Sequence, residues 1–188
     1  MNNKENAIRQ IEEFLQSDEK CMLFTGTNQY EKHKLVMRVL NNQLENHLLL
    51  FRTNAMQNIN NNEHLGWAGV KRNPKAGERI KIRKNTYECD SLNSSNTWYK
   101  TTGKFSCALV YPIDPLCRDG KTDAIDDLFN HKDISKIFLI TWTDRHEYDY
   151  SLFDKYVDRQ VVYDAEEEDP AYHKRVLDIV DEIDGRRN

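Results

Sequence analysis

The sequence predicts an α/β fold: a mostly parallel five-stranded sheet with helices on both faces and an inserted antiparallel β-hairpin. Continuous apolar runs recur along the chain, as in strands that are covered on both faces. Segments with apolar residues at helical spacing separate these runs, and alternation of strand and helix indicates a parallel sheet. One stretch, 78–83, instead alternates charged and apolar residues, which is typical of a half-exposed strand.

Five apolar runs are expected to form the strands of the parallel sheet. Each run is short and is followed by polar or turn-forming residues, such as Gly26 after the first and Pro112 after the third. The expected strands are 21–25, 47–52, 106–111, 136–142 and 160–163.

Amphipathic segments between and around these runs predict the helices. The last of them begins at Pro170, which suits a first helical turn, and it follows the acidic run 166–169, which is favourable near the positive end of a helix. The spacing of apolar residues over 152–157 predicts a further short helix. The main helices are expected at 4–17, 33–44, 124–129 and 170–183.

The chain between the second and third strands reads as an insertion, at about 54–104. It begins with an Asn-rich loop over 54–62 and continues into an antiparallel hairpin, with 78–83 and 97–102 as its strands. A chain of 188 residues usually forms one domain. We therefore expect a single α/β domain over residues 1–188 that contains this insertion.

Composition places the chain on the polar side of globular proteins, with 31% charged residues, a mean hydropathy of -0.83 and a net charge of -4. The sequence shows no targeting signal, and no apolar run in it approaches the roughly 20 residues that span a bilayer. The four cysteines form no C-x-x-C pair, so we interpret them as reduced thiols. These features predict a cytoplasmic protein.

Charge is spread unevenly, as on a partner surface or, more commonly, on solvated faces. The carboxyl-terminal forty residues are strongly acidic, whereas the segment 71–84 is basic. Basic residues next to aromatic side chains suit single-stranded nucleic acid, but they also protect an edge strand from aggregation. A protein partner is expected, and nucleic acid is the alternative, through Lys71, Arg72, Lys75, Arg79, Lys81, Arg83 and Lys84.

The first strand, the Gly26 turn and the following helix have the local geometry that aims backbone amides at an anion. In the phosphate-loop pattern G-x-x-x-x-G-K-[ST], Gly26 takes the first position and Lys32 takes the lysine position. Glu31 stands where the second Gly belongs, and His33 where the Ser or Thr belongs. Over its first fifty residues the chain thus resembles a P-loop NTPase with a degenerate phosphate-binding loop.

The resemblance implies that Gly26, Thr27, Asn28 and Lys32 hold phosphate, with ATP or GTP and magnesium as the ligands. The two departures argue against hydrolysis, because a carboxylate at Glu31 repels phosphate and the imidazole of His33 is a poor ligand for magnesium. The alternative is an ordinary strand-to-helix turn with a solvated lysine.

Polar residues also follow the third and fourth strands, at the sheet edge where ligands of parallel sheets bind. They are expected to form a polar site, with Asp114 or Asp144 nearest to any metal, although acids in such positions also cap turns. No dedicated metal site is expected, because the acidic run 166–169 matches a helix dipole. The predicted strand-end site comprises Asp114, Thr141, Thr143, Asp144 and Arg145.

The favoured function is that of a degenerate P-loop-like protein without hydrolytic activity, acting as a nucleotide-responsive or structural component of a bacterial assembly. A non-enzymatic protein-interaction module is one alternative. A nucleic-acid-associated accessory protein that uses the basic segment is the other.

Overall fold

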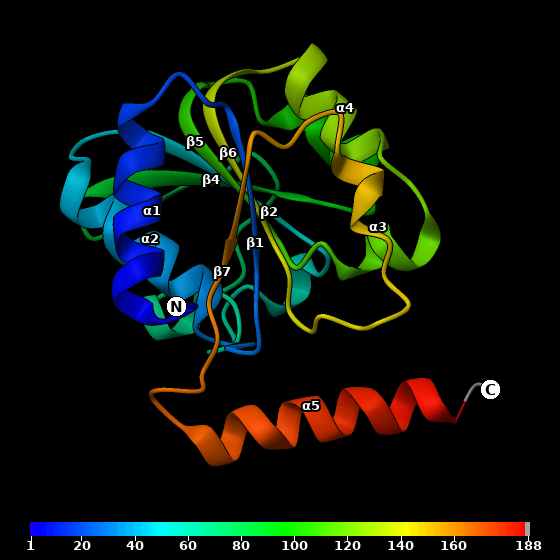
Figure 1. The fold of residues 1–188 in the computed structure, drawn as a ribbon. Helices are drawn as coiled ribbons and strands as arrows, with labels where there is room; N and C mark the ends of the chain where they lie inside the picture. The colour runs from blue at the N-terminus through cyan, green and yellow to red at the C-terminus, as the bar shows by residue number, and fades with distance from the viewer. Residues whose placement is uncertain (187–188) are drawn as a thin grey trace.

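The computed structural model describes residues 1–186, which form a seven-stranded sheet between two layers of helices (Figure 1). The strand order is β3-β4-β2-β5-β6-β1-β7. Every neighbouring pair is parallel except β3 and β4. This arrangement confirms the predicted α/β fold. The strands are β1 (Cys21–Thr25), β2 (Leu48–Thr53), β3 (Arg79–Ile82), β4 (Asn85–Ser91), β5 (Lys104–Tyr111), β6 (Asp133–Ile140) and β7 (Arg159–Val162).

Two helices cover each face of the sheet, and a fifth lies beyond its end. Figure 1 shows α1 and α2 on one side, α3 and α4 on the other, and α5 apart from both layers. The α-helices are α1 (Lys4–Gln16), α2 (Lys32–Gln43), α3 (Asp114–Asp119), α4 (Asp123–Asn130) and α5 (Pro170–Gly185). Short 3-10 helices are η1 (Met56–Asn58), η2 (Gly66–Ala68), η3 (Ser95–Lys100) and η4 (Tyr150–Phe153).

Both faces of the central strands are buried, which is why these strands read as continuous apolar runs. In β1, Met22 and Phe24 belong to the core beneath α1 and α2, whereas Cys21 and Leu23 belong to the core beneath α3 and α4. All five residues of β1 are buried. The strand that precedes the Gly26 turn is therefore fixed on both sides.

The insertion differs from the prediction in its second half. Residues 97–102 were expected to form a strand, but Ser95–Lys100 form the 3-10 helix η3. The reason is local hydrogen bonding: Thr97 accepts the Ser91 amide and donates to the Ser94 carbonyl, and the Trp98 indole donates to the Ser91 carbonyl. These side chains satisfy the turn, so the segment needs no strand partner.

The hairpin itself is formed by β3 and β4. Its second strand, β4, pairs in parallel with β2 and thereby extends the main sheet.

The prediction of a helix at 152–157 was also wrong. The chain there contains only the short 3-10 helix η4 (Tyr150–Phe153), which Asp149 caps by accepting the Ser151 amide. Within residues 1–186, no helix has both the length and the apolar character needed to cross a bilayer.

Candidate functional site

The crevice between β1 and β6 lies where the chain leaves two neighbouring parallel strands in opposite directions. After β1 the chain enters α2 on one face, and after β6 it enters the η4 segment, which packs with α3 and α4 on the other face (Figure 1). Such points are where parallel sheets bind ligands. The structure brings the loop from Gly26 to Lys32 together here with the segment that follows β6.

Gly26 is required by the backbone at the start of the loop. Its φ is 120°, and a Cβ at this position would lie 2.1 Å from the carbonyl oxygen of Tyr163. Only glycine accommodates both the dihedral angle and the close approach. The glycine that suggested a phosphate loop is therefore explained by packing against β7 and the residue after it.

The first three amides of the loop all have partners within the chain. The Gly26 amide donates to the carboxylate of Asp144 at 2.5 Å, and the Thr27 amide donates to Asp164 at 2.9 Å. The Asn28 amide donates to the backbone carbonyl that follows β7 at 3.3 Å. In a phosphate-binding loop these donors face an anion. Here two of them face the chain's own carboxylates.

Lys32 is fully buried and points back into the same crevice. Its Nζ donates to the carbonyl of Gly26 at 2.5 Å, to Thr141 Oγ1 at 2.8 Å and to the carbonyl of Trp142 at 3.2 Å. An ammonium group has three donors, and these contacts use them. The carboxylate of Asp144 lies 3.7 Å from Nζ and supplies the counter-charge.

Acidic groups outnumber the cation in this crevice. Burial lowers the pKa of Lys32, while the carboxylates of Asp144, Asp114 and Asp164 act in the opposite direction. The surplus of carboxylates gives the crevice a negative field, which is unfavourable for a phosphate.

Asp114 follows β5 and is held by backbone amides. Its two carboxylate oxygens accept the amides of Trp142 at 2.7 Å and Thr143 at 2.9 Å. Burial raises the pKa of Asp114, and the two amides and Lys32 limit the increase. Asp114 therefore ties the start of α3 to the segment after β6.

His33 occupies the position at which a phosphate loop has its Ser or Thr. The imidazole is buried and stacks on Tyr111, with ring centroids 4.0 Å apart and an interplanar angle of 17°. Its Nε2 lies 2.9 Å from the carbonyl oxygen of His64 and donates to it. Burial lowers the pKa of His33 to about 3, so the ring is neutral. Two stacked rings thus fill the place of a hydroxyl that could bind magnesium.

The other predicted residues have distinct partners. The hydroxyl of Thr143 accepts a hydrogen bond from the Gln29 amide at 2.6 Å, so it belongs to the crevice. Arg145 does not reach the crevice, because it pairs with Glu147 and its Nε lies 4.0 Å from Asp184 of α5. Glu31 pairs with Lys34 at 2.9 Å and with Arg38 at 3.0 Å, on the outer side of α2.

Helix α5 lies across the carboxyl edge of the sheet and contacts both sides of the crevice. At its start, His173 Nδ1 lies 2.7 Å from Thr27 Oγ1, and the hydroxyl of Tyr172 donates to Gln29 at 3.1 Å. Near its end, Asp181 lies 2.7 Å from His146 Nε2. The helix therefore bridges the Gly26 loop and the segment after β6.

Asp164 and the role of α5 were missed by the sequence reasoning. Asp164 comes two residues after β7, a strand-end position similar to that of Asp144. The rule that singled out Asp144 could therefore have found Asp164, whereas no sequence pattern indicates that α5 crosses the edge. Across residues 1–186, no group of three or more His, Cys, Asp or Glu side chains is arranged to hold a metal ion.

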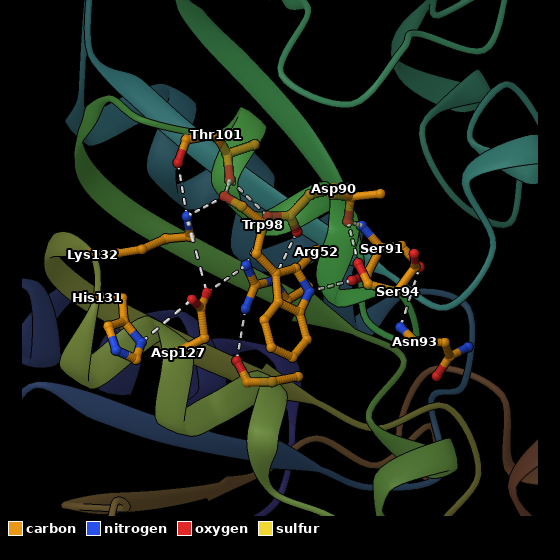
Figure 2. Close-up of polar contacts among 12 residues, drawn as sticks. Arg52, Asp90, Ser91, Asn93, Ser94, Trp98, Thr101, Asp127, His131 and Lys132 are labelled. Carbon is orange, nitrogen blue, oxygen red and sulfur yellow. Dashed lines mark hydrogen bonds and ion pairs between the residues drawn. The ribbon is translucent and has the colours of Figure 1, made fainter.

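A second polar cluster, also missed, surrounds the buried Arg52 at the end of β2 (Figure 2). The guanidinium binds Asp90 of β4 through two hydrogen bonds of 2.7 Å, and it contacts Asp127 at 2.9 Å. It also donates to the carbonyl of Ala124 at 2.7 Å, and it lies 4.8 Å from the ring centroid of Trp98.

Lys132, which lies between the end of α4 and the start of β6, completes this cluster (Figure 2). Its ammonium donates to the carbonyls of Trp98 and Thr101 at 2.7 Å each, and the Thr101 hydroxyl donates to Asp90 at 2.8 Å. The cluster joins β2 and β4 to η3 and α4. Because its donors and acceptors pair with one another, we interpret it as structural. Its only sequence signal is an arginine that follows the apolar run of β2.

The basic segment 71–84 is partly neutralised. Arg72 pairs with Glu78, and Arg79 pairs with Glu88 of the neighbouring strand at 3.0 Å. Strand β3 is an edge of the sheet, so its charges suit protection of that edge. Nucleic-acid binding through this segment stays a prediction.

No protein-family model matches the chain, and no curated protein matches it. Among solved structures, the fold is similar to that of the large terminase from a thermophilic bacteriophage, with a TM-score of 0.51 and 5% sequence identity. The match covers 84% of this chain and 44% of the terminase, so the chain spans less than half of the protein it matches. This similarity concerns the fold, and it is consistent with the P-loop-like fold expected from the sequence.

We expect the loss of Arg52 to destabilise the fold more than the loss of one partner of an exposed ion pair. Substitution Arg52→Met leaves the buried carboxylate of Asp90 without its cation, which costs roughly 3–5 kcal/mol. The matched control, Arg118→Met, removes an exposed pair with Asp119 and should cost at most about 1 kcal/mol. Urea denaturation of the two variants measures the difference. Equal losses would show that the buried carboxylate of Asp90 does not depend on Arg52.

The contact of His146 with α5 is expected to weaken as pH rises. The carboxylates of Asp181 and, more weakly, Asp184 raise the pKa of His146 above its usual 6.5. The stabilisation is therefore complete below pH 6.5 and is lost as pH rises through the elevated pKa of the folded state. An NMR titration of His146 should show the raised pKa, and Asp181→Asn should lower it. An unchanged pKa in that variant would contradict the contact.

Proposed function

We propose that the chain is a P-loop-like α/β protein that does not hydrolyse nucleotides and that works as a structural component of a larger assembly. One observation supports this proposal above all others. The carboxylates of Asp144 and Asp164 accept the amides of Gly26 and Thr27, which are the donors that a phosphate would need.

A carboxylate in this position acts as an internal substitute for phosphate. Asp144 accepts the Gly26 amide and provides the nearby negative charge for Lys32, as a phosphate oxygen would. A phosphate entering the crevice would have to displace this carboxylate or lie beside it. Two unit charges 4 Å apart repel by about 4 kcal/mol at an effective dielectric constant of 20. The internal carboxylates therefore oppose nucleotide binding.

Hydrolysis would also lack its usual metal ligands. His33 replaces the hydroxyl that binds magnesium in a phosphate loop, and its ring is stacked on Tyr111. Both oxygens of Asp114 accept backbone amides. A carboxylate that holds the main chain in this way is less available to a metal ion or its water molecules. These contacts support a structural role for the crevice.

Surface features support participation in an assembly. Helix α5 carries Leu177 and Ile179, which are 41% and 46% exposed, next to acidic residues. The two side chains lie two positions apart and so point to different sides of α5, where each is a separate apolar contact point for a partner. The fold similarity also involves only part of a larger protein, the phage large terminase. We infer that this chain works as one module among several.

Thermal unfolding with ATP or GTP, with and without magnesium, tests the absence of nucleotide binding. A ligand at 100 times its Kd stabilises the folded state by about 2.7 kcal/mol, which raises the Tm of a chain of this size by several degrees. We expect no increase at millimolar nucleotide. A magnesium-dependent increase would instead favour a nucleotide-responsive protein.

Removing the internal carboxylate should open the loop to phosphate. In Asp144→Ala the Gly26 amide and Lys32 lose their anionic neighbour, so inorganic triphosphate should raise the Tm of this variant and not that of the wild type. The matched control is Asp154→Asn, which removes an exposed charge outside the crevice. If triphosphate leaves Asp144→Ala unaffected while the variant stays folded, exclusion of phosphate by Asp144 is wrong.

A further inference from the structure

A cavity of about 170 Å³ lies beside the Lys32 crevice, at the carboxyl edge of the sheet. The segments that follow four strands meet around it: Tyr30 after β1, Asn54 after β2, Pro112 after β5 and Trp142 after β6. It is therefore at the edge where a parallel sheet binds ligands, but it is lined by different side chains from those that fill the crevice.

Aromatic rings form much of the wall of this cavity. Tyr30 and Trp142 meet with their centroids 5.9 Å apart and an interplanar angle of 60°. Tyr111 and His64 meet at 5.9 Å and 64°. Tyr111 is 2% exposed and stacks one face on His33, so Tyr30 and Trp142 are the rings that offer more of their surface to the cavity. Trp142 is 38% exposed, although it is a large apolar side chain.

The charges around the cavity favour a cation. Glu63 is the only charged side chain among the described residues that line it, and neither Lys nor Arg lines it within residues 1–186. Glu63 is exposed and makes no ion pair with a described residue. Burial lowers the pKa of His64, so its imidazole is neutral near pH 7. Lys32 nearby is already balanced by the carboxylates around it.

His64 also has an unpaired ring nitrogen. Its side chain is 8% exposed, and its Nε2 lies 3.5 Å from Asn54 Oδ1. Its Nδ1 is buried without a hydrogen-bond partner among the described residues. A buried polar atom left unpaired is uncommon in proteins and calls for an explanation. A quaternary ammonium has no N–H to donate to this nitrogen, so a cation in the cavity acts on it only through its charge.

We propose that this cavity binds a small organic cation of the quaternary or methylated ammonium class. Faces of Trp and Tyr attract such cations through the ring quadrupole. A carboxylate at the edge of the cavity adds a Coulombic attraction that a neutral ligand of the same shape does not receive. The same carboxylate disfavours phosphate and other anions. The proposal concerns a cavity next to the crevice and does not depend on the proposed structural function.

The experiment is a calorimetric titration of the full-length protein with choline, and with 3,3-dimethyl-1-butanol as a neutral ligand of the same shape. We expect saturable binding of choline and binding of the neutral ligand that is at least about twofold weaker, since a cation–π contact at an exposed site contributes that much or more. Equal affinity for the two ligands would overturn the proposal. The absence of choline binding at about 10 mM, well above the millimolar Kd of a weak site, would overturn it too.

Two variants locate the binding site. Glu63→Gln removes the carboxylate, and Trp142→Leu removes an exposed ring while keeping an apolar side chain. Trp142→Leu should weaken choline binding about two- to fivefold through the lost cation–π contact, and Glu63→Gln should weaken it by up to about fivefold through the lost ion pair. Glu45→Gln, which removes an exposed carboxylate outside the cavity, should leave it unchanged. Circular dichroism confirms that each variant is folded. Unchanged affinity in both cavity variants would refute the assignment.

A second titration distinguishes the two sources of this cation. A short peptide that contains trimethyllysine is compared with the same peptide that contains unmodified lysine. Tighter binding of the trimethylated peptide than of choline indicates a side chain of a protein partner. Binding of choline without added affinity from the peptide indicates a free metabolite. Binding of both peptides with equal affinity would show that methylated ammonium is not what the cavity recognises.

Discussion

The structure of the crevice depends on the contact of one carboxylate with one buried cation. Asp144 lies 3.7 Å from Lys32 Nζ and accepts the Gly26 amide, so it balances the lysine and fixes the loop at the same time. A fully buried lysine without a nearby carboxylate would be costly, because burial disfavours its charged form. Once Asp144 takes this role, the loop no longer needs an external anion. The loop is then complete as part of the folded chain.

The neighbouring residues are consistent with this internal pairing. Asp164 satisfies the Thr27 amide, and Asp114 satisfies the amides after β6. His33 and Tyr111 fill the adjoining space as stacked, uncharged rings. Each contact replaces an interaction that a nucleotide or a metal ion would make in a phosphate loop. The replacement extends across several loops, so a single substitution in the motif does not account for it.

Much of the fold could be predicted from the sequence, because buried parallel strands and amphipathic helices leave clear patterns. The helices α1 and α2 and the five core strands fall close to their expected positions. The segment 97–102 was mistaken for a strand, because its aromatic residues suggest β-structure while its hydrogen bonds are made by side chains to the nearby turn. The predicted residues Lys32, Thr141 and Asp144 do meet. Their pairing with one another, and the separation of Arg145 from them, depend on tertiary contacts that no local pattern specifies.

The pairing of two buried cations near the carboxyl edge of the sheet explains why the aromatic cavity differs from its surroundings. Arg52 and Lys32 both lie near the carboxyl edge, and each is paired with carboxylates and carbonyls of the chain. Their donors are used, so neither can offer a strong contact to an added anion. The aromatic cavity has the opposite character, with an unpaired carboxylate at Glu63, an unpaired ring nitrogen at His64 and no lysine or arginine among the described residues that line it. Because the cations beside this cavity are already paired, the carboxylate and the rings remain for a ligand, and these groups favour a cation over an anion.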